Sequence, residues 1–265
     1  MGGGARSGVS DADRKPVPGG GKKTHKGGST PIPADQIPSW ETPTSKVIER
    51  AATKNLPLLI LFGGEEDESA EADYIWGKEI VALAKEKAVF VRVPYNSDRE
   101  PSWETGSPIP TSKILGKNPS RDYGIKSYPT MLVTDAYGNE FYRVTTKPDA
   151  GTLKRFFENV AEQGKKTNEK LQKVLDAAKK SFETKDAAKT LKGLIDNFRT
   201  GVVGLAAQEE SIKLYHKVLE GGREELKSTV AAGGKDLEKK LKDLKKVYKD
   251  TELNKEIDAA LKDAK

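Results

Sequence analysis

Short apolar runs alternate with helical patterns through the middle of the chain, and this order predicts strands separated by helices. Residues 57–62 and 88–93 are nearly uninterrupted apolar runs, which are typical of strands buried on both faces. Between the two runs, residues 68–87 place apolar side chains at helical spacing, so we expect one long helix there. A helix is also expected over residues 44–54, where a hydroxyl residue can cap its start.

A proline introduces the next apolar run, and the pattern predicts a hairpin. Pro129 precedes Thr-Met-Leu-Val-Thr at residues 130–134. A proline has no N–H, so it belongs at the first residue of a strand rather than in its middle. Residues 135–139 are typical of a turn and residues 141–145 of a second strand. A closing helix is expected at residues 151–162.

The last hundred residues are rich in Lys, Glu, Leu and Ala, with apolar positions three and four apart. Helices are therefore expected at residues 167–182, 185–199, 203–231 and 235–263. Glycines such as the Gly221–Gly222 pair are expected to mark weak points or ends. The pattern predicts an all-α region, either a small bundle or a helical repeat. Residues 247–253 resemble the turn between the helices of a tetratricopeptide repeat, but the full signature of that repeat is missing.

The N-terminal segment differs from the rest of the chain. Residues 1–37 are dominated by Gly, Pro, Ser, Thr and Lys, and such a segment buries too little apolar surface to offset its ordering entropy. We therefore predict a disordered basic segment at 1–38, an α/β domain at 39–163 and a helical domain at 164–265.

Neither a membrane span nor a leader is visible in the sequence. No apolar run reaches the roughly 20 residues that a membrane helix requires, and Met1 is followed by Gly-Gly-Gly-Ala-Arg rather than by an apolar segment. The expected location is the cytoplasm, or the periplasm or exterior if a leader was removed.

The charge balance favours a solvated surface. The chain has 35% hydrophobic and 32% charged residues and a net charge of +6. Residues 161–265 hold 24 basic and 19 acidic side chains. Such a mixture of signs argues against a binding surface for nucleic acid or anionic lipid.

The order strand, helix, strand, proline-led hairpin and closing helix resembles the thioredoxin fold. Tyr128-Pro129-Thr130 looks like the cis-proline loop of that family, and residues 57–62 correspond to its central strand. The resemblance covers roughly residues 44–162 and implies that the first two strands are parallel, with a right-handed crossover. The predicted fold class is therefore α/β, with a thioredoxin-like central mixed sheet flanked by helices and followed by an all-α C-terminal helical region.

The chain has no cysteine, and this changes the function that the resemblance implies. Thioredoxins continue from the strand-ending aromatic residue into Trp-Cys-x-x-Cys. Counted from Phe62, Asp67 and Ala70 occupy the two cysteine positions. Thiol–disulfide exchange requires a thiolate, so it is excluded. Zinc-binding clusters, a dinucleotide fingerprint and a nucleophile elbow are also missing from the sequence. We therefore predict no enzyme, no cofactor and no bound metal.

A binding function does not need the lost cysteines. In thioredoxins an extended peptide pairs with the backbone beside the cis-proline, and main-chain hydrogen bonds supply the contact. The resemblance thus implies a groove with one wall made of Ser127, Tyr128, Pro129 and Thr130, and the other of Gly64, Glu65, Glu66, Asp67 and Glu68. We expect a protein or peptide partner and a protein-binding or scaffold module.

The acidic residues at 65–73 allow a second interpretation. We favour an acidic turn at a helix N-terminus, where negative charge is stabilising. The alternative function is a carboxylate site that binds a hard cation such as Ca²⁺ or carries out hydrolysis. The spacing of these carboxylates matches no calcium-binding loop.

Two tryptophans are candidate loop anchors for a partner. Trp40 and Trp103 stand in the repeated phrase Pro-Ser-Trp-Glu-Thr, and each phrase is followed shortly by Pro-Thr-Ser-Lys. Tryptophan is frequent at binding hot spots, so both could contact a partner. Coincidence in a low-complexity background is the other interpretation.

Overall fold

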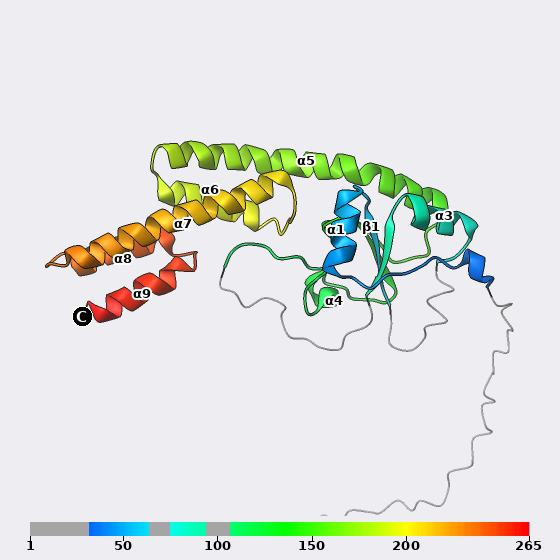
Figure 1. Ribbon diagram of the computed structural model, residues 1–265, viewed down its shortest axis with the longest axis horizontal. Coiled ribbons are helices and arrows are strands. Elements are labelled where there is room, and N and C mark those ends of the chain that lie inside the picture. The colour runs from blue at the N-terminus through cyan, green and yellow to red at the C-terminus, as the bar shows by residue number, and fades with distance from the viewer. Residues whose placement is uncertain (1–31, 64–74, 94–106, 265) are drawn as a thin grey trace, which may run out of the picture. The chain divides into compact units, whose positions relative to one another are not determined.

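The apolar runs form strands because their large aliphatic and β-branched side chains can be buried on both faces of a sheet. The computed structural model describes residues 32–63, 75–93 and 107–264 (Figure 1). Among these residues one sheet has the strand order β2-β1-β3-β4. Its strands are β1 (Leu58–Phe62), β2 (Val89–Val93), β3 (Thr130–Thr134) and β4 (Glu140–Val144).

The sheet is mixed, as predicted. β1 pairs parallel with β2 and antiparallel with β3, and β3 pairs antiparallel with β4. The strands expected at 57–62, 88–93 and 141–145 are confirmed to within one residue at each end.

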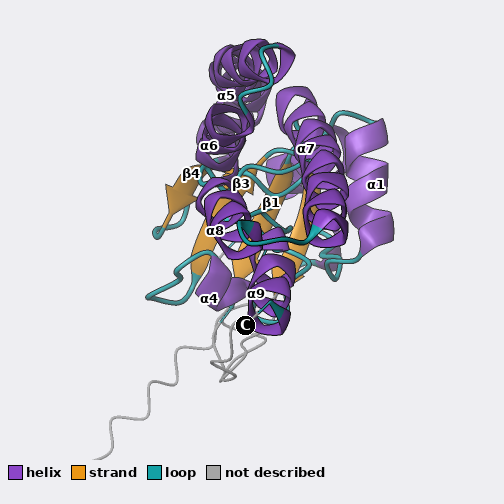
Figure 2. Ribbon diagram, turned by 90° about the vertical axis from the view of Figure 1, so that its left-hand side faces the viewer, coloured by secondary structure: helices purple, strands orange, loops and turns teal. Residues whose placement is uncertain are grey.

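Helices cover both faces of this sheet, and Figure 2 shows the strands between them. On one face lies α1 (Ser45–Thr53), whose start is capped by Thr44 Oγ1, which accepts the Val47 N–H at 3.3 Å. On the other face lie α3 (Lys78–Glu86) and the first turns of α5 (Ala150–Glu183). Two short helices, η1 (Ala34–Gln36) and α4 (Pro119–Asp122), also lie in this part of the chain.

The helix expected at 68–87 begins only at Lys78 in the described part of the chain. Gly77 precedes α3 with a φ of 128°, which is incompatible with a helix. Ile75 is buried in the core although it lies outside the helix. Residues 68–74 lie outside the described residues.

The C-terminal helices enclose a second apolar core. They are α6 (Ala187–Phe198), α7 (Ala206–Ala232), α8 (Leu237–Tyr248) and α9 (Leu253–Asp263), which pack with the second half of α5. The predicted fold class is thus confirmed: a mixed sheet with flanking helices, followed by a large helical region. Among the described helices, none has an apolar stretch that could span a membrane.

Three helix predictions were wrong in their boundaries. The helices expected at 151–162 and 167–182 are one helix, α5, because the intervening residues contain only Gly164 as a weak breaker, at about 1 kcal/mol. The helix expected at 235–263 is divided into α8 and α9. The Gly221–Gly222 pair lies inside α7 rather than at an end. The predicted domain boundary between residues 163 and 164 falls inside α5 and stays a prediction.

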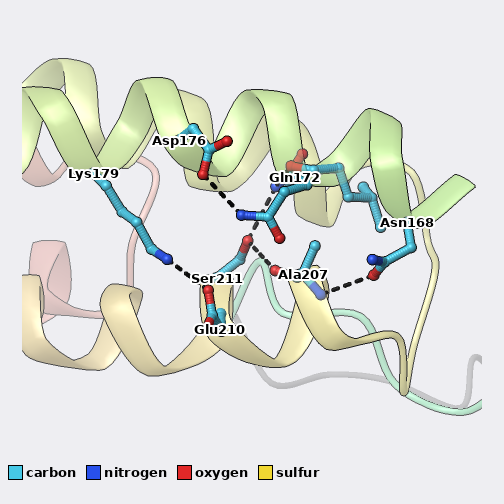
Figure 3. A network of polar contacts seen from close by, with 9 residues as sticks. Asn168, Gln172, Asp176, Lys179, Ala207, Glu210 and Ser211 are labelled. Atoms are coloured by element: carbon cyan, nitrogen blue, oxygen red, sulfur yellow. Dashed lines mark hydrogen bonds and ion pairs between the residues drawn. The ribbon is translucent and has the colours of Figure 1, made fainter.

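A polar network links α5, α6 and α7 (Figure 3). Asn197, which is 1% exposed, donates to the Leu171 carbonyl at 3.1 Å and to Ser211 Oγ at 3.0 Å. Ser211 Oγ in turn donates to the Ala207 carbonyl at 2.7 Å. At the start of α7, Asn168 Oδ1 accepts the Ala207 N–H at 2.9 Å. Because buried polar groups need partners, this network restricts how the three helices can pack.

Candidate functional site

The four residues predicted to form one wall of a groove lead into β3. Ser127 is exposed, Tyr128 and Pro129 are half-buried, and Thr130 is buried as the first residue of the strand. Thr130 Oγ1 donates to the Ser127 carbonyl at 2.6 Å, and the Tyr128–Pro129 peptide bond is cis. Thr130 pairs with Phe62 at the end of β1, so this turn lies where the central strand ends.

The opposite wall, Gly64 to Glu68, lies outside the described residues, as does the acidic stretch 65–73. The last described residue before it, Gly63, is buried, and its N–H donates to the Val93 carbonyl at 3.4 Å. No group of three or more His, Asp or Glu side chains able to hold a metal ion occurs in residues 32–63, 75–93 and 107–264. The carboxylate site at 65–73 and the expected absence of a metal therefore stay predictions.

Trp76 lies at the same end of the sheet and was not singled out in the sequence. Its side chain is 38% exposed, and Lys147 Nζ lies 4.8 Å from its ring centroid. Lys147 follows β4, whose last residue, Val144, pairs with Met131 beside Thr130. The Trp76 indole therefore lies close to the end of β4, next to the Ser127–Thr130 turn. The sequence held one local signal for this position, a Trp directly before the Gly that precedes a helix. Because we expected one continuous helix over residues 68–87, Trp76 was not recognised as a candidate site residue.

Trp40 lies along the outer edge of β2. Its ring centroid is 5.2 Å from that of Phe90, and its side chain is half-buried. The next residue, Glu41, donates its N–H to the Phe90 carbonyl and accepts the Arg92 N–H, both at 2.9 Å. This segment thus covers the edge strand. Trp103 lies outside the described residues, so the pair of loop anchors stays a prediction.

At the opposite end of the sheet, the buried Tyr123 and the half-buried Asp135 hold the β3–β4 turn. Tyr123 donates its hydroxyl hydrogen to the Gly138 carbonyl at 2.6 Å. Burial raises the pKa of Tyr123, and the nearby Asp135, Glu140 and Asp122 carboxylates raise it further.

Asp135 organises the same turn. It accepts the N–H groups of Tyr137 at 2.9 Å and Asn139 at 3.0 Å, as well as the Asn139 side-chain amide at 2.7 Å. Burial raises the pKa of Asp135, and these hydrogen bonds oppose that effect. Because its hydrogen bonds are all made within this turn, the Asp135 carboxylate has a structural role.

Asn139 connects this turn to the helical region. Its Nδ2 donates to the Val203 carbonyl at 2.8 Å, and its Oδ1 accepts the Val203 N–H at 2.9 Å. Beside this contact, Gly204 has a φ of 74°, and a Cβ there would lie 2.3 Å from the Tyr137 ring. The loop before α7 therefore lies so close to the β3–β4 hairpin that only glycine fits at position 204.

Comparisons with known proteins find thioredoxin-like structures. No protein-family model matches the chain, and no curated protein matches it. A structure titled DsbH oxidoreductase is 15% identical and covers 49% of this chain and 92% of its own, with a TM-score of 0.35. A mutant thioredoxin from Halobacterium salinarum NRC-1 is 14% identical and covers 49% of this chain and 96% of its own, with a TM-score of 0.30. At these values the assignment of the fold rests on the sheet topology described above.

Proposed function

We propose that this chain is a non-enzymatic protein- or peptide-binding module, and that an extended peptide binds beside the Ser127–Thr130 turn. Thiol–disulfide exchange needs a cysteine thiolate, and the chain has no cysteine. The proposed activity therefore uses the backbone and side chains at the end of β1 and the start of β3.

The observation that carries the proposal is the exposed indole of Trp76 at this end of the sheet. Tyr128 and Pro129 are half-buried on the neighbouring turn, and the Lys147 ammonium lies over the Trp76 ring. Partly exposed aromatic rings next to a cation are favoured anchors in binding surfaces. A peptide strand placed here would gain main-chain hydrogen bonds and aromatic contacts together.

Peptide selection tests the proposal. Peptides selected from a random display library on the full chain are synthesised with a fluorophore, and their Kd is measured by fluorescence anisotropy. We expect Trp76→Ala to weaken binding by about 30-fold, which corresponds to the roughly 2 kcal/mol of a binding hot spot. Tyr128→Ala should weaken it as well.

The control is Val230→Ala, which removes an exposed apolar side chain from α7 and should leave the Kd unchanged. Circular dichroism spectra confirm that each variant is folded. The proposal is wrong if no peptide is enriched, or if Trp76→Ala and Tyr128→Ala bind the selected peptides as tightly as the unchanged chain.

A further inference from the structure

We propose that a cationic cleft on the helical region binds a small phosphorylated molecule that also carries hydroxyl groups. The cleft lies between residues 107–113, the end of α6 and the α8–α9 turn, and its volume is about 760 Å³. Small-molecule sites typically measure roughly 300–1,000 Å³. The side chains that define the cationic cleft are those of Lys113, Arg199, Lys249, Lys255, Thr251 and Asn254.

The charges lining the cleft are unbalanced. Four cations line it, together with a single carboxylate, Asp250. Arg199 is paired with Asp196 at 3.0 Å, whereas Lys113, Lys249 and Lys255 form no ion pair with any residue that the structure describes. A multiply charged anion is the natural complement of such a lining.

Lys255 occupies an unusual position for a cation. It is the third residue of α9, and the N-terminal turn of a helix favours negative charge. The two neighbouring glutamates are engaged elsewhere, since Glu252 accepts the Tyr215 hydroxyl at 2.5 Å and Glu256 pairs with Arg223 at 2.9 Å. An anion in the cleft would be stabilised by both Lys255 and the helix dipole.

Asn254 narrows the chemistry of the ligand. Its Oδ1 atom is shielded from solvent and accepts no hydrogen bond from a described residue. A buried acceptor without a donor is costly, so we expect the Asn254 side chain to turn its amide oxygen toward the cleft and accept a hydrogen bond from a hydroxyl group of the ligand. Thr111 and Thr251 add further hydroxyls to the lining. A ligand whose phosphate group binds the lysines and whose hydroxyl group binds Asn254 would be a phosphorylated polyol or sugar.

Isothermal titration calorimetry of the full chain with three probes tests this inference. The probes are inorganic phosphate, ribose 5-phosphate and ribose. We expect ribose 5-phosphate to bind more tightly than inorganic phosphate, and ribose to give no heat of binding. If neither phosphate compound binds at millimolar concentration, the inference is overturned. Equal affinity for the two phosphate compounds would overturn the assignment of a hydroxyl contact.

Charge variants localise the site. Lys249→Gln and Lys255→Gln should each weaken ribose 5-phosphate binding about ten-fold, the loss expected for one charge-assisted hydrogen bond. The matched control is Lys227→Gln, which removes an exposed lysine of α7 that does not line the cleft and should leave the Kd unchanged. Equal weakening in all three variants would indicate attraction to overall charge and would overturn the site. Asn254→Ala should remove the preference for ribose 5-phosphate over phosphate.

Discussion

Single buried polar residues fix the packing of the helical region, and Asn197 is the clearest example. Its amide bridges α5 and α7 from α6 through the Leu171 carbonyl and Ser211 Oγ. Asn197→Ala removes both hydrogen bonds and leaves a small void, so the free energy of unfolding should fall by about 1–3 kcal/mol. Urea denaturation followed by circular dichroism measures the change. Lys192→Ala on the exposed face of α6 is the control and should stay within about 0.5 kcal/mol.

Asp135 should make stability depend on pH. Because burial raises the pKa of Asp135 above its ordinary value of 3.8, the folded chain holds this proton at a pH where the unfolded chain has lost it. The free energy of unfolding contributed by Asp135 is therefore highest below pH 4 and falls as the pH rises through the raised pKa. Asp135→Asn removes this dependence.

Urea denaturation between pH 3 and pH 7 compares the two chains. The stability of Asp135→Asn relative to the unchanged chain should increase as the pH rises above about 4. A difference in stability that does not change with pH across this range would contradict the raised pKa of Asp135. Altered hydrogen bonds at the turn would add a constant offset to the difference and would leave its slope with pH unchanged.

Within the helical elements, two adjacent glycines of α7 should respond in opposite directions. A Cβ at Gly221 would meet no atom within 4 Å, whereas one at Gly222 would lie 2.5 Å from Tyr248 Cζ and 2.7 Å from Leu253 Cδ2. Gly221→Ala should stabilise the chain by about 0.5–1 kcal/mol, because alanine is the better helix former. Gly222→Ala should destabilise it by about 1–3 kcal/mol through overpacking.

Thermal denaturation of the two variants gives the comparison directly, since both lie in the same helix and carry the same chemical change. If Gly222→Ala is as stable as Gly221→Ala, then α8 and α9 do not pack on α7 as described.

The elements that could be predicted are those whose signal is local. The run Leu58–Phe62 has only apolar side chains, and every one of them is buried. The boundaries that were missed depend on single backbone conformations or on packing. Gly77 stops a helix with a positive φ, and the α8–α9 break is held by Thr251 Oγ1, which donates to the Tyr248 carbonyl at 2.7 Å.

The candidate site was predictable only in part. The Ser127–Thr130 turn could be located because a proline before an apolar run is a local signal. The position of Trp76 beside that end of the sheet depends on the pairing of β3 with β4 and on the approach of Lys147, which are long-range contacts. The four cations of the cationic cleft are residues 113, 199, 249 and 255, and no pattern along the chain connects them.

Across residues 32–63, 75–93 and 107–264, three features join the sheet to the helical region. The first half of α5 packs on the sheet and the second half in the helical core. Ile109, from the segment before α4, also packs against that helical core. Asn139 makes two hydrogen bonds to Val203. We therefore expect the sheet and the helical region to unfold in a single transition.

Two optical signals test this cooperativity. All three tryptophans lie before residue 150, so their fluorescence reports on the N-terminal part, whereas far-UV circular dichroism is dominated by the helices after it. The two urea transitions should coincide in the unchanged chain. Asn139→Ala removes both hydrogen bonds to Val203, so we expect its two transitions to separate. Asn159→Ala on α5, where the side chain makes no hydrogen bond to a described residue, should keep them together. Separate transitions in the unchanged chain would mean that Asn139 and α5 hold the two regions in contact without coupling their stability.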